Sequence, residues 1–196
     1  PWHSQRRELA VRVHEASANR KLAPIYREPY ASSTYSGRGR PRPAGPFVSA
    51  TYVSIEATCR DDCQFKAGGC YVRAGFTKGM SNDLDAIAAR RKLSPLDVAR
   101  QEAQMIARMF SGRSIPQDGA RDGAGGRPLR LHIGGDAHDA PSARVLAKAA
   151  TAWLARRGGP VWTYTHSWRH VARAAFGRIS VLASVEDIWD ALLAID

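Results

Sequence analysis

The stretch that decides the fold is Phe47–Ile55, FVSATYVSI, which leads directly to the three cysteines of the chain, Cys59, Cys63 and Cys70. β-Branched and aromatic residues alternate with small ones in this stretch, a pattern that predicts a strand. Two adjacent glycines in the segment that follows predict an irregular loop. We therefore expect all three thiols in one loop, just beyond the carboxyl end of a strand.

Three clustered thiols are compatible with several chemistries. They could form a disulfide with one thiol left over, bind zinc, bind an iron–sulfur cluster, or remain unligated and buried. Disulfide-rich proteins are small, secreted and dense in cysteine, whereas this chain has 196 residues, three cysteines and no apolar signal segment at its start. The spacings Cx3C and x6C differ from the close pairs that structural zinc favours, and three soft thiolates suit a cluster with one open iron. Spacing alone leaves cluster and zinc about equally supported.

The overall composition indicates a globular protein with an anionic partner. Hydrophobic residues make up 44% of the chain, and 29 Lys and Arg against 18 Asp and Glu give a net charge of +11. No apolar run approaches the length of a membrane span, so we expect no membrane partner. Without a signal or membrane segment, the expected location is the cytoplasm, which would be that of the host cell for a phage protein.

The segment 1–46 is expected to be an irregular basic arm. It carries nine Lys or Arg and three Glu, and Ser32–Pro43 is rich in Gly, Pro and Arg, although a helix-compatible piece lies around Glu8–Ala18. Arginines with interleaved tyrosines are typical of segments that contact nucleic acid. A solvated arm that packs over the core is the alternative.

After the cysteine loop the chain is expected to alternate between helices and strands. The expected strands are Leu129–Ile133, Val161–Thr165 and Ile179–Ala183, and the expected helical segments are Asp83–Lys92, Ser94–Phe110, Pro141–Arg156, Trp168–Ala175 and Val185–Ile195. Such alternation predicts parallel pairing through right-handed crossovers. With Phe47–Ile55 this gives about four strands, hence an α/β fold that is either half of a βα barrel or a small parallel sheet, over residues 47–196.

Polar residues follow the carboxyl end of every expected strand, where such folds bind their ligands. Beyond the cysteines they are Gly134, Gly135, Asp136 and His138, then Thr165, His166, Ser167, Trp168 and Arg169, and finally Ser184 and Glu186. Each also has an ordinary structural interpretation, since Asp136 and Ser184 could be helix caps. Because four consecutive strand ends behave alike, we favour one shared site.

Several of these motifs together resemble a bacteriophage protein family of largely unassigned function. That family has a TCxxxC…CY loop, an R-x-H-x-S/G-G-D strand end and a YTKS-like strand end, in this order. The matching segments here are Thr58–Cys59, Cys63, Cys70–Tyr71, Leu131–Asp136, Tyr164–Arg169 and Val181–Ser184. The resemblance spans about Phe47 to Glu186 and does not cover the basic arm.

More distantly, the layout resembles the radical S-adenosylmethionine enzymes. These enzymes place a three-cysteine loop after the first strand of a partial βα barrel and carry a GGE motif after the second strand, near the amino group of the methionine. Gly134–Asp136 occupies the equivalent place in this chain. Two departures are the spacing Cx3Cx6C instead of Cx3Cx2C, and an aromatic residue, Tyr71, that follows the third cysteine instead of preceding it.

The resemblance implies that residues 47–196 form an iron–sulfur domain in which Cys59, Cys63 and Cys70 hold a 4Fe–4S cluster. S-adenosylmethionine would then bind the open iron. Asp136 is expected to bind the ammonium group of S-adenosylmethionine, next to Gly134 and Gly135. The other polar groups of the ligand are expected to contact Ser167, Arg169, Ser184 or Glu186. The alternative is a non-catalytic cluster or zinc protein that contacts nucleic acid or a host protein through its arm. In that hypothesis His132 or His138 could complete the coordination.

Overall fold

The computed structural model describes residues 8–17, 48–109, 128–156 and 158–195. Within these residues, five strands form one sheet in the order β1-β2-β3-β4-β5. They are β1 (Val11–Ser17), β2 (Val48–Val53), β3 (Leu129–Arg130), β4 (Val161–Thr165) and β5 (Ser180–Ala183). β1 pairs with β2 antiparallel, and all pairs from β2 to β5 are parallel. The α/β class and the parallel pairing are therefore confirmed.

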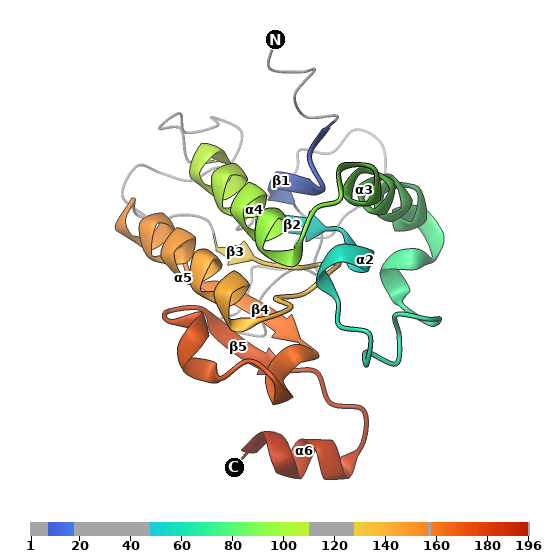
Figure 1. The fold of residues 1–196 in the computed structure, drawn as a ribbon. Coiled ribbons are helices and arrows are strands. Elements are labelled where there is room, and N and C mark those ends of the chain that lie inside the picture. The colour runs from blue at the N-terminus through green and yellow to red at the C-terminus, as the bar shows by residue number, and fades with distance from the viewer. Residues whose placement is uncertain (1–7, 18–47, 110–127, 157, 196) are drawn as a thin grey trace, which may run out of the picture.

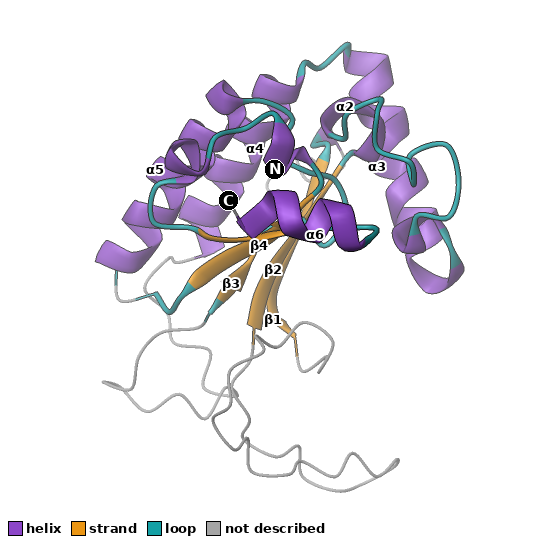
Figure 2. Ribbon diagram, turned by 90° about the horizontal axis from the view of Figure 1, so that it is seen from below, coloured by secondary structure: helices purple, strands orange, loops and turns teal. Residues whose placement is uncertain are grey.

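The longer helices lie against the two faces of this sheet. The helical segments are α2 (Ile55–Thr58), η3 (Tyr71–Arg73), η4 (Gly75–Thr77), α3 (Lys78–Arg91), α4 (Pro95–Met109), α5 (Ala140–Ala155), η6 (Ser167–Arg169), η7 (Arg173–Phe176) and α6 (Ile188–Ile195). Figures 1 and 2 show α4 and α5 side by side on one face. On the other face, Leu84 of α3 packs with Val48 and Ala50 of β2. The helices expected from the sequence are thus present, and the expected turn from Trp168 to Ala175 is two 3-10 helices.

The expected helix-compatible piece at Glu8–Ala18 was wrong, because Val11–Ser17 is a strand. Val11 and Val13 alternate with polar residues, the period of a strand, and Val11 packs against Val53 and Val98. Val11–Ser17 therefore belongs to the sheet and not to an irregular arm. Residues 18–47, including Phe47, lie outside the described part of the chain, so the rest of the expected arm remains a prediction.

Within the described residues the core has three apolar clusters, which lie on both faces of the sheet. On the face covered by α4 and α5, Leu131 and Val161 pack against Leu146 and Trp153 of α5. On the opposite face, Tyr52, Ile133 and Trp162 join the side chains from α3 and β2. Burial of these side chains provides the main driving force for folding and fixes the strand register, because a one-residue slip would reverse the two faces.

A charged pair is buried on the face covered by α4 and α5. Glu102 of α4 and His132 are joined through Oε2 and Nε2 at 3.1 Å, and each side chain is only 1% exposed. Thr51 Oγ1 donates to Glu102 Oε1 at 2.5 Å, and His132 Nδ1 lies 3.2 Å from Thr163 Oγ1. Because the Thr163 hydroxyl donates to the Tyr164 carbonyl, it accepts from His132. Both ring nitrogens of His132 therefore act as donors, as in an imidazolium.

This pair predicts a loss of stability as the pH rises. Burial by itself lowers the pKa of His132, but the charge and hydrogen bond of Glu102 and the charge of Asp136 together raise it above the ordinary value. Because the pKa of His132 is higher in the folded state, its stabilising contribution is complete below the unfolded value of about 6.5. This contribution is lost as the pH rises through the folded value. We expect the unfolding free energy, measured in urea, to fall over that range.

The Glu102→Gln variant should remove most of this pH dependence, because it keeps the side-chain shape and deletes the charge. Asp83→Asn, on the exposed surface of α3, is the matched control and should keep it. A pH dependence equally strong in Glu102→Gln would contradict the pairing.

Candidate metal centre

The cysteine loop begins where a short helix ends. Ser54 Oγ accepts a hydrogen bond from Ala57 N at 3.2 Å and so starts α2. The helix ends at Cys59, whose backbone is extended at φ −75° and ψ 142°. The chain then turns through Cys63, whose carbonyl accepts from Lys66 N at 2.9 Å, and reaches Cys70 at the start of η3. The sequence expectation of one irregular loop beyond the β2 strand is confirmed.

A lysine ammonium closes this loop. Lys66 Nζ donates to the Cys59 carbonyl at 2.9 Å, to the Glu56 carbonyl at 3.2 Å and to Asp61 at 2.7 Å. Its side chain is only 14% exposed. Lys66 therefore ties the middle of the loop back to the carboxyl end of α2, where a cation is favourable.

All three cysteine thiols are free and half-buried. Burial raises the pKa of the Cys59 thiol, and the charges of Asp136, Cys63 and Cys70 raise it further, against a lowering by Lys66. Thiolates at these positions would therefore repel one another unless a cation lay between them. Among the described residues, no group of three or more His, Cys, Asp or Glu side chains is placed to hold a metal ion. Metal binding by the cysteines thus remains a prediction.

The two glycines at the end of the second parallel strand are packed against protein. A Cβ on Gly134 would lie 2.8 Å from Val72 Cγ1, and one on Gly135 would lie 2.2 Å from Val53 Cγ2. Gly135 also has a φ of +87°, which glycine adopts without strain. The glycines therefore allow the loop after β3 to contact the end of β2 and η3 closely. Because glycine has no side chain, the space beside the two residues is filled by the side chains of Val72 and Val53.

Asp136 joins the end of β3 to the end of β4. Its Oδ1 accepts from Ala137 N and from Thr165 Oγ1, each at 2.7 Å. Its Oδ2 accepts from His166 N at 2.8 Å and from Ser167 N at 3.2 Å. An ionised carboxylate has about four acceptor positions, so all of them are used. Asp136 caps the turn after β4, and α5 is instead capped by Asp139, which accepts from Ser142 N.

The ends of β4 and β5 are also linked. His166 Nε2 and Glu186 Oε1 are 2.9 Å apart, and Trp168 Nε1 donates to the Ser184 carbonyl at 2.9 Å. Arg169 forms an ion pair with Asp190 of α6. The structure thus places Glu186 and Ser184 beside the turn after β4. Ser167 is 1% exposed, and its hydroxyl has no hydrogen-bond partner within the described ranges.

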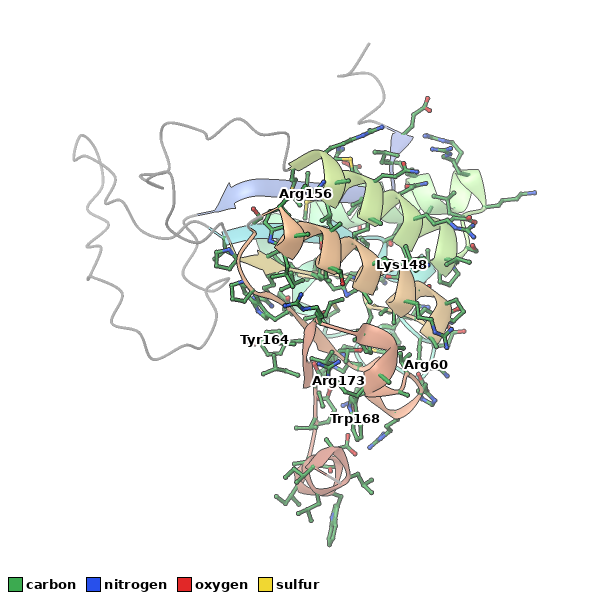
Figure 3. The ribbon with its side chains drawn as sticks, turned by 90° about the vertical axis from the view of Figure 1, so that its left-hand side faces the viewer. Arg60, Lys148, Arg156, Tyr164, Trp168 and Arg173 are labelled. Atoms are coloured by element: carbon green, nitrogen blue, oxygen red, sulfur yellow. The ribbon has the colours of Figure 1, made fainter. Side chains whose placement is uncertain are left out.

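The cysteine loop contacts this same region. The rings of Phe65 and His166 meet edge-on with centroids 5.7 Å apart, and Asp62 Oδ2 lies 2.8 Å from His170 Nε2. Figure 3 shows Arg60, from the cysteine loop, and Trp168 toward one end of the molecule, well away from Arg156. The expected convergence of the strand ends is therefore present in the contacts between their loops.

The structure separates the two histidines proposed as a further ligand. His132 is buried between Glu102 and Thr163 and has a φ of +52°, so neither ring nitrogen faces the cysteines. His138 is half-buried and close enough to Asp61 to lower the pKa of that carboxyl, although the hydrogen bond and charge of Lys66 lower it more. Of the two, only His138 lies near the cysteine loop.

Sequence reasoning missed Lys66 and Glu102. A polar residue among Val98, Met105 and Ile106 on the buried face of α4 was a visible signal for Glu102, because uncompensated charge is rarely placed on such a face. No comparable pattern marks Lys66, whose partners are backbone carbonyls.

Among the helices that the structure describes, none combines the length and the apolar character needed to cross a membrane. Comparison with protein-family models, with curated proteins and with solved structures gives no match to this chain.

Proposed function

We propose that Cys59, Cys63 and Cys70 hold a 4Fe–4S cluster. The observation that carries this proposal is that three free, half-buried thiols lie in one loop at the carboxyl end of the first parallel strand. Lys66 closes this loop through its hydrogen bond to the Cys59 carbonyl. The chemistry of the donors supports the proposal, because thiolates are the soft ligands that iron–sulfur clusters take. Such a cluster, when bound, supplies redox-active iron with one position not taken by a cysteine.

The order of the strands supports a partial βα barrel around this loop. β2 to β5 follow one another in chain order, with α4 and α5 on the same face of the sheet. A doubly wound sheet would instead reverse its strand order at a switch point. Winding in one direction is the arrangement from which barrels are built, with ligands at the carboxyl ends of the strands.

Radical S-adenosylmethionine chemistry is the enzymatic form of this proposal. Its support is the position of the cysteine loop in a sheet wound in one direction, and the buried Ser167 hydroxyl at the end of β4. The proposed ammonium contact of Asp136 receives no support, because backbone and threonine donors already use its acceptor positions. Asp136 instead positions the turn that presents Ser167 and Arg169.

The alternative is a non-catalytic cluster or zinc protein that binds nucleic acid or a host protein. It is favoured by the net charge of +11 and by the mutual pairing of Arg169 with Asp190 and of Glu186 with His166. These pairs give both side chains a structural role that needs no ligand.

Electron paramagnetic resonance of the reduced, reconstituted protein separates the two forms. If the enzyme form is correct, saturating S-adenosylmethionine should change the spectrum of the reduced cluster. Adenosine, which lacks the methionine amine and carboxylate, is the control and should leave it unchanged. A cluster signal that S-adenosylmethionine does not alter would exclude the enzyme form and leave the cluster protein.

A further inference from the structure

An arginine lies among three tyrosines on the face of the sheet opposite α4 and α5. Arg130 of β3 is in register with Ala50 of β2 and Trp162 of β4, so its side chain shares their face. Tyr52 and Tyr164 lie two residues further along their strands and therefore also on this face. We call Tyr52, Tyr71, Arg130 and Tyr164 the arginine–tyrosine cluster.

The contacts within the cluster centre on the guanidinium. Arg130 Cζ lies 5.1 Å from the ring centroid of Tyr164, a cation–π distance. Burial raises the pKa of Tyr52, and the positive charge of Arg130 opposes that rise. The same positive charge also acts on the Tyr71 phenol, which places both tyrosines near the guanidinium. Arg130 is the one basic residue of the cluster.

The cluster has a buried side and an accessible side. Tyr52 is 7% exposed and Tyr71 is 64% exposed, while Arg130 and Tyr164 are half-buried. Tyr71 directly follows Cys70, and its hydroxyl donates to the Ile133 carbonyl at the end of the second parallel strand. This hydrogen bond holds an exposed aromatic ring in one place beside the strand ends. In Figure 3, Tyr164 and Lys148 of α5 lie toward different sides of the molecule.

We propose that the arginine–tyrosine cluster binds one nucleotide unit, with Arg130 on the phosphate and the Tyr71 ring against the base. A guanidinium binds phosphate oxygens through paired hydrogen bonds, and tyrosine rings stack on bases of any sequence. A simple anion site would not need an exposed aromatic ring, and a site for a neutral aromatic ligand would not need a guanidinium. The net charge of +11 attracts such a ligand. A free nucleotide and the end of a single strand share this chemistry.

Calorimetric titration of the full chain with adenosine monophosphate tests the proposal. Arg130→Gln removes the phosphate ligand and Tyr71→Ala removes the stacking ring, and each should weaken binding at least about tenfold. Tyr71→Phe keeps the ring and should retain most of the affinity. Arg90→Gln, an exposed arginine of α3, is the matched control and should bind as the unaltered protein does.

Three comparisons decide the outcome. Adenosine and inorganic phosphate should each bind more weakly than adenosine monophosphate, and a short oligodeoxyadenylate titrated in parallel shows whether a strand end is preferred. No binding of the nucleotide, equal binding of inorganic phosphate, or unaltered binding by both Arg130→Gln and Tyr71→Ala would overturn the proposal. Iron measured on the same samples keeps this result separate from the cluster, because nucleotide binding can fail while iron binding persists.

Discussion

Replacing Cys63 with alanine should abolish cluster binding. Anaerobic reconstitution with ferrous iron and sulfide should give the unaltered protein broad visible absorption, and the variant should stay colourless. The physical reason is that two thiolates rarely hold a cubane that normally takes three or four. Gln64→Ala, an exposed neighbour in the same loop, is the matched control and should bind iron normally. Iron and sulfide per chain, measured after removal of unbound metal, provide the readout.

A Cys63→Ala protein that kept its full iron and sulfide would contradict the proposed ligand set. His138→Ala sharpens this test, because of the two histidines expected as possible ligands, His132 and His138, it is His138 that lies near the loop. If the three thiols are sufficient, His138→Ala should keep the cluster. Loss of iron in His138→Ala together with its retention in Cys63→Ala would assign the coordination to a different set of side chains.

Replacing Asp136 with alanine should strongly destabilise the fold. The carboxylate accepts four hydrogen bonds, and its loss leaves the donors on Ala137 N, Thr165 Oγ1 and His166 N without that acceptor, whereas Ser167 N still donates to Thr165 Oγ1. Each unsatisfied buried donor costs about 1–3 kcal/mol, so we expect the unfolding free energy in urea to fall by about 3–5 kcal/mol. Asp83→Ala, on the exposed surface of α3, should change it by less than about 0.5 kcal/mol.

The Asp136→Asn variant distinguishes a positioning role from contact with a ligand. Asparagine keeps one oxygen that can accept, so it should recover part of the lost stability. If Asp136 only positions the turn after β4, Asp136→Asn should bind iron and respond to S-adenosylmethionine as the unaltered protein does. Full stability in Asp136→Ala would contradict the hydrogen-bond network described above.

The sequence predicted the elements whose signals are local. The structure contains the strand expected over Phe47–Ile55 as β2, the helix expected over Ser94–Phe110 as α4, and the strand–helix repeats that follow. The clustering of cysteines and the meeting of strand ends followed from these elements, because parallel strands present their carboxyl ends on one edge of a sheet.

The features that sequence reasoning missed depend on contacts between distant segments. Val11–Ser17 is a strand because it pairs with β2, and only the alternation of Val11 and Val13 signals that choice locally. Asp136 was expected to cap the following helix or to contact a ligand, whereas three of its four hydrogen-bond donors come from the end of β4 and the turn after it. A carboxylate next to a helix start does not reveal which donors the tertiary fold will bring to it.

The most direct test of the cluster is the metal content of the protein purified without oxygen. Iron, acid-labile sulfide and zinc should be measured on one sample, with the absorption spectrum recorded beforehand. If Cys59, Cys63 and Cys70 hold a 4Fe–4S cluster, the sample should be brown and contain about four iron and about four sulfide per chain. Stoichiometric zinc with neither iron nor sulfide, persisting after anaerobic reconstitution, would contradict the account.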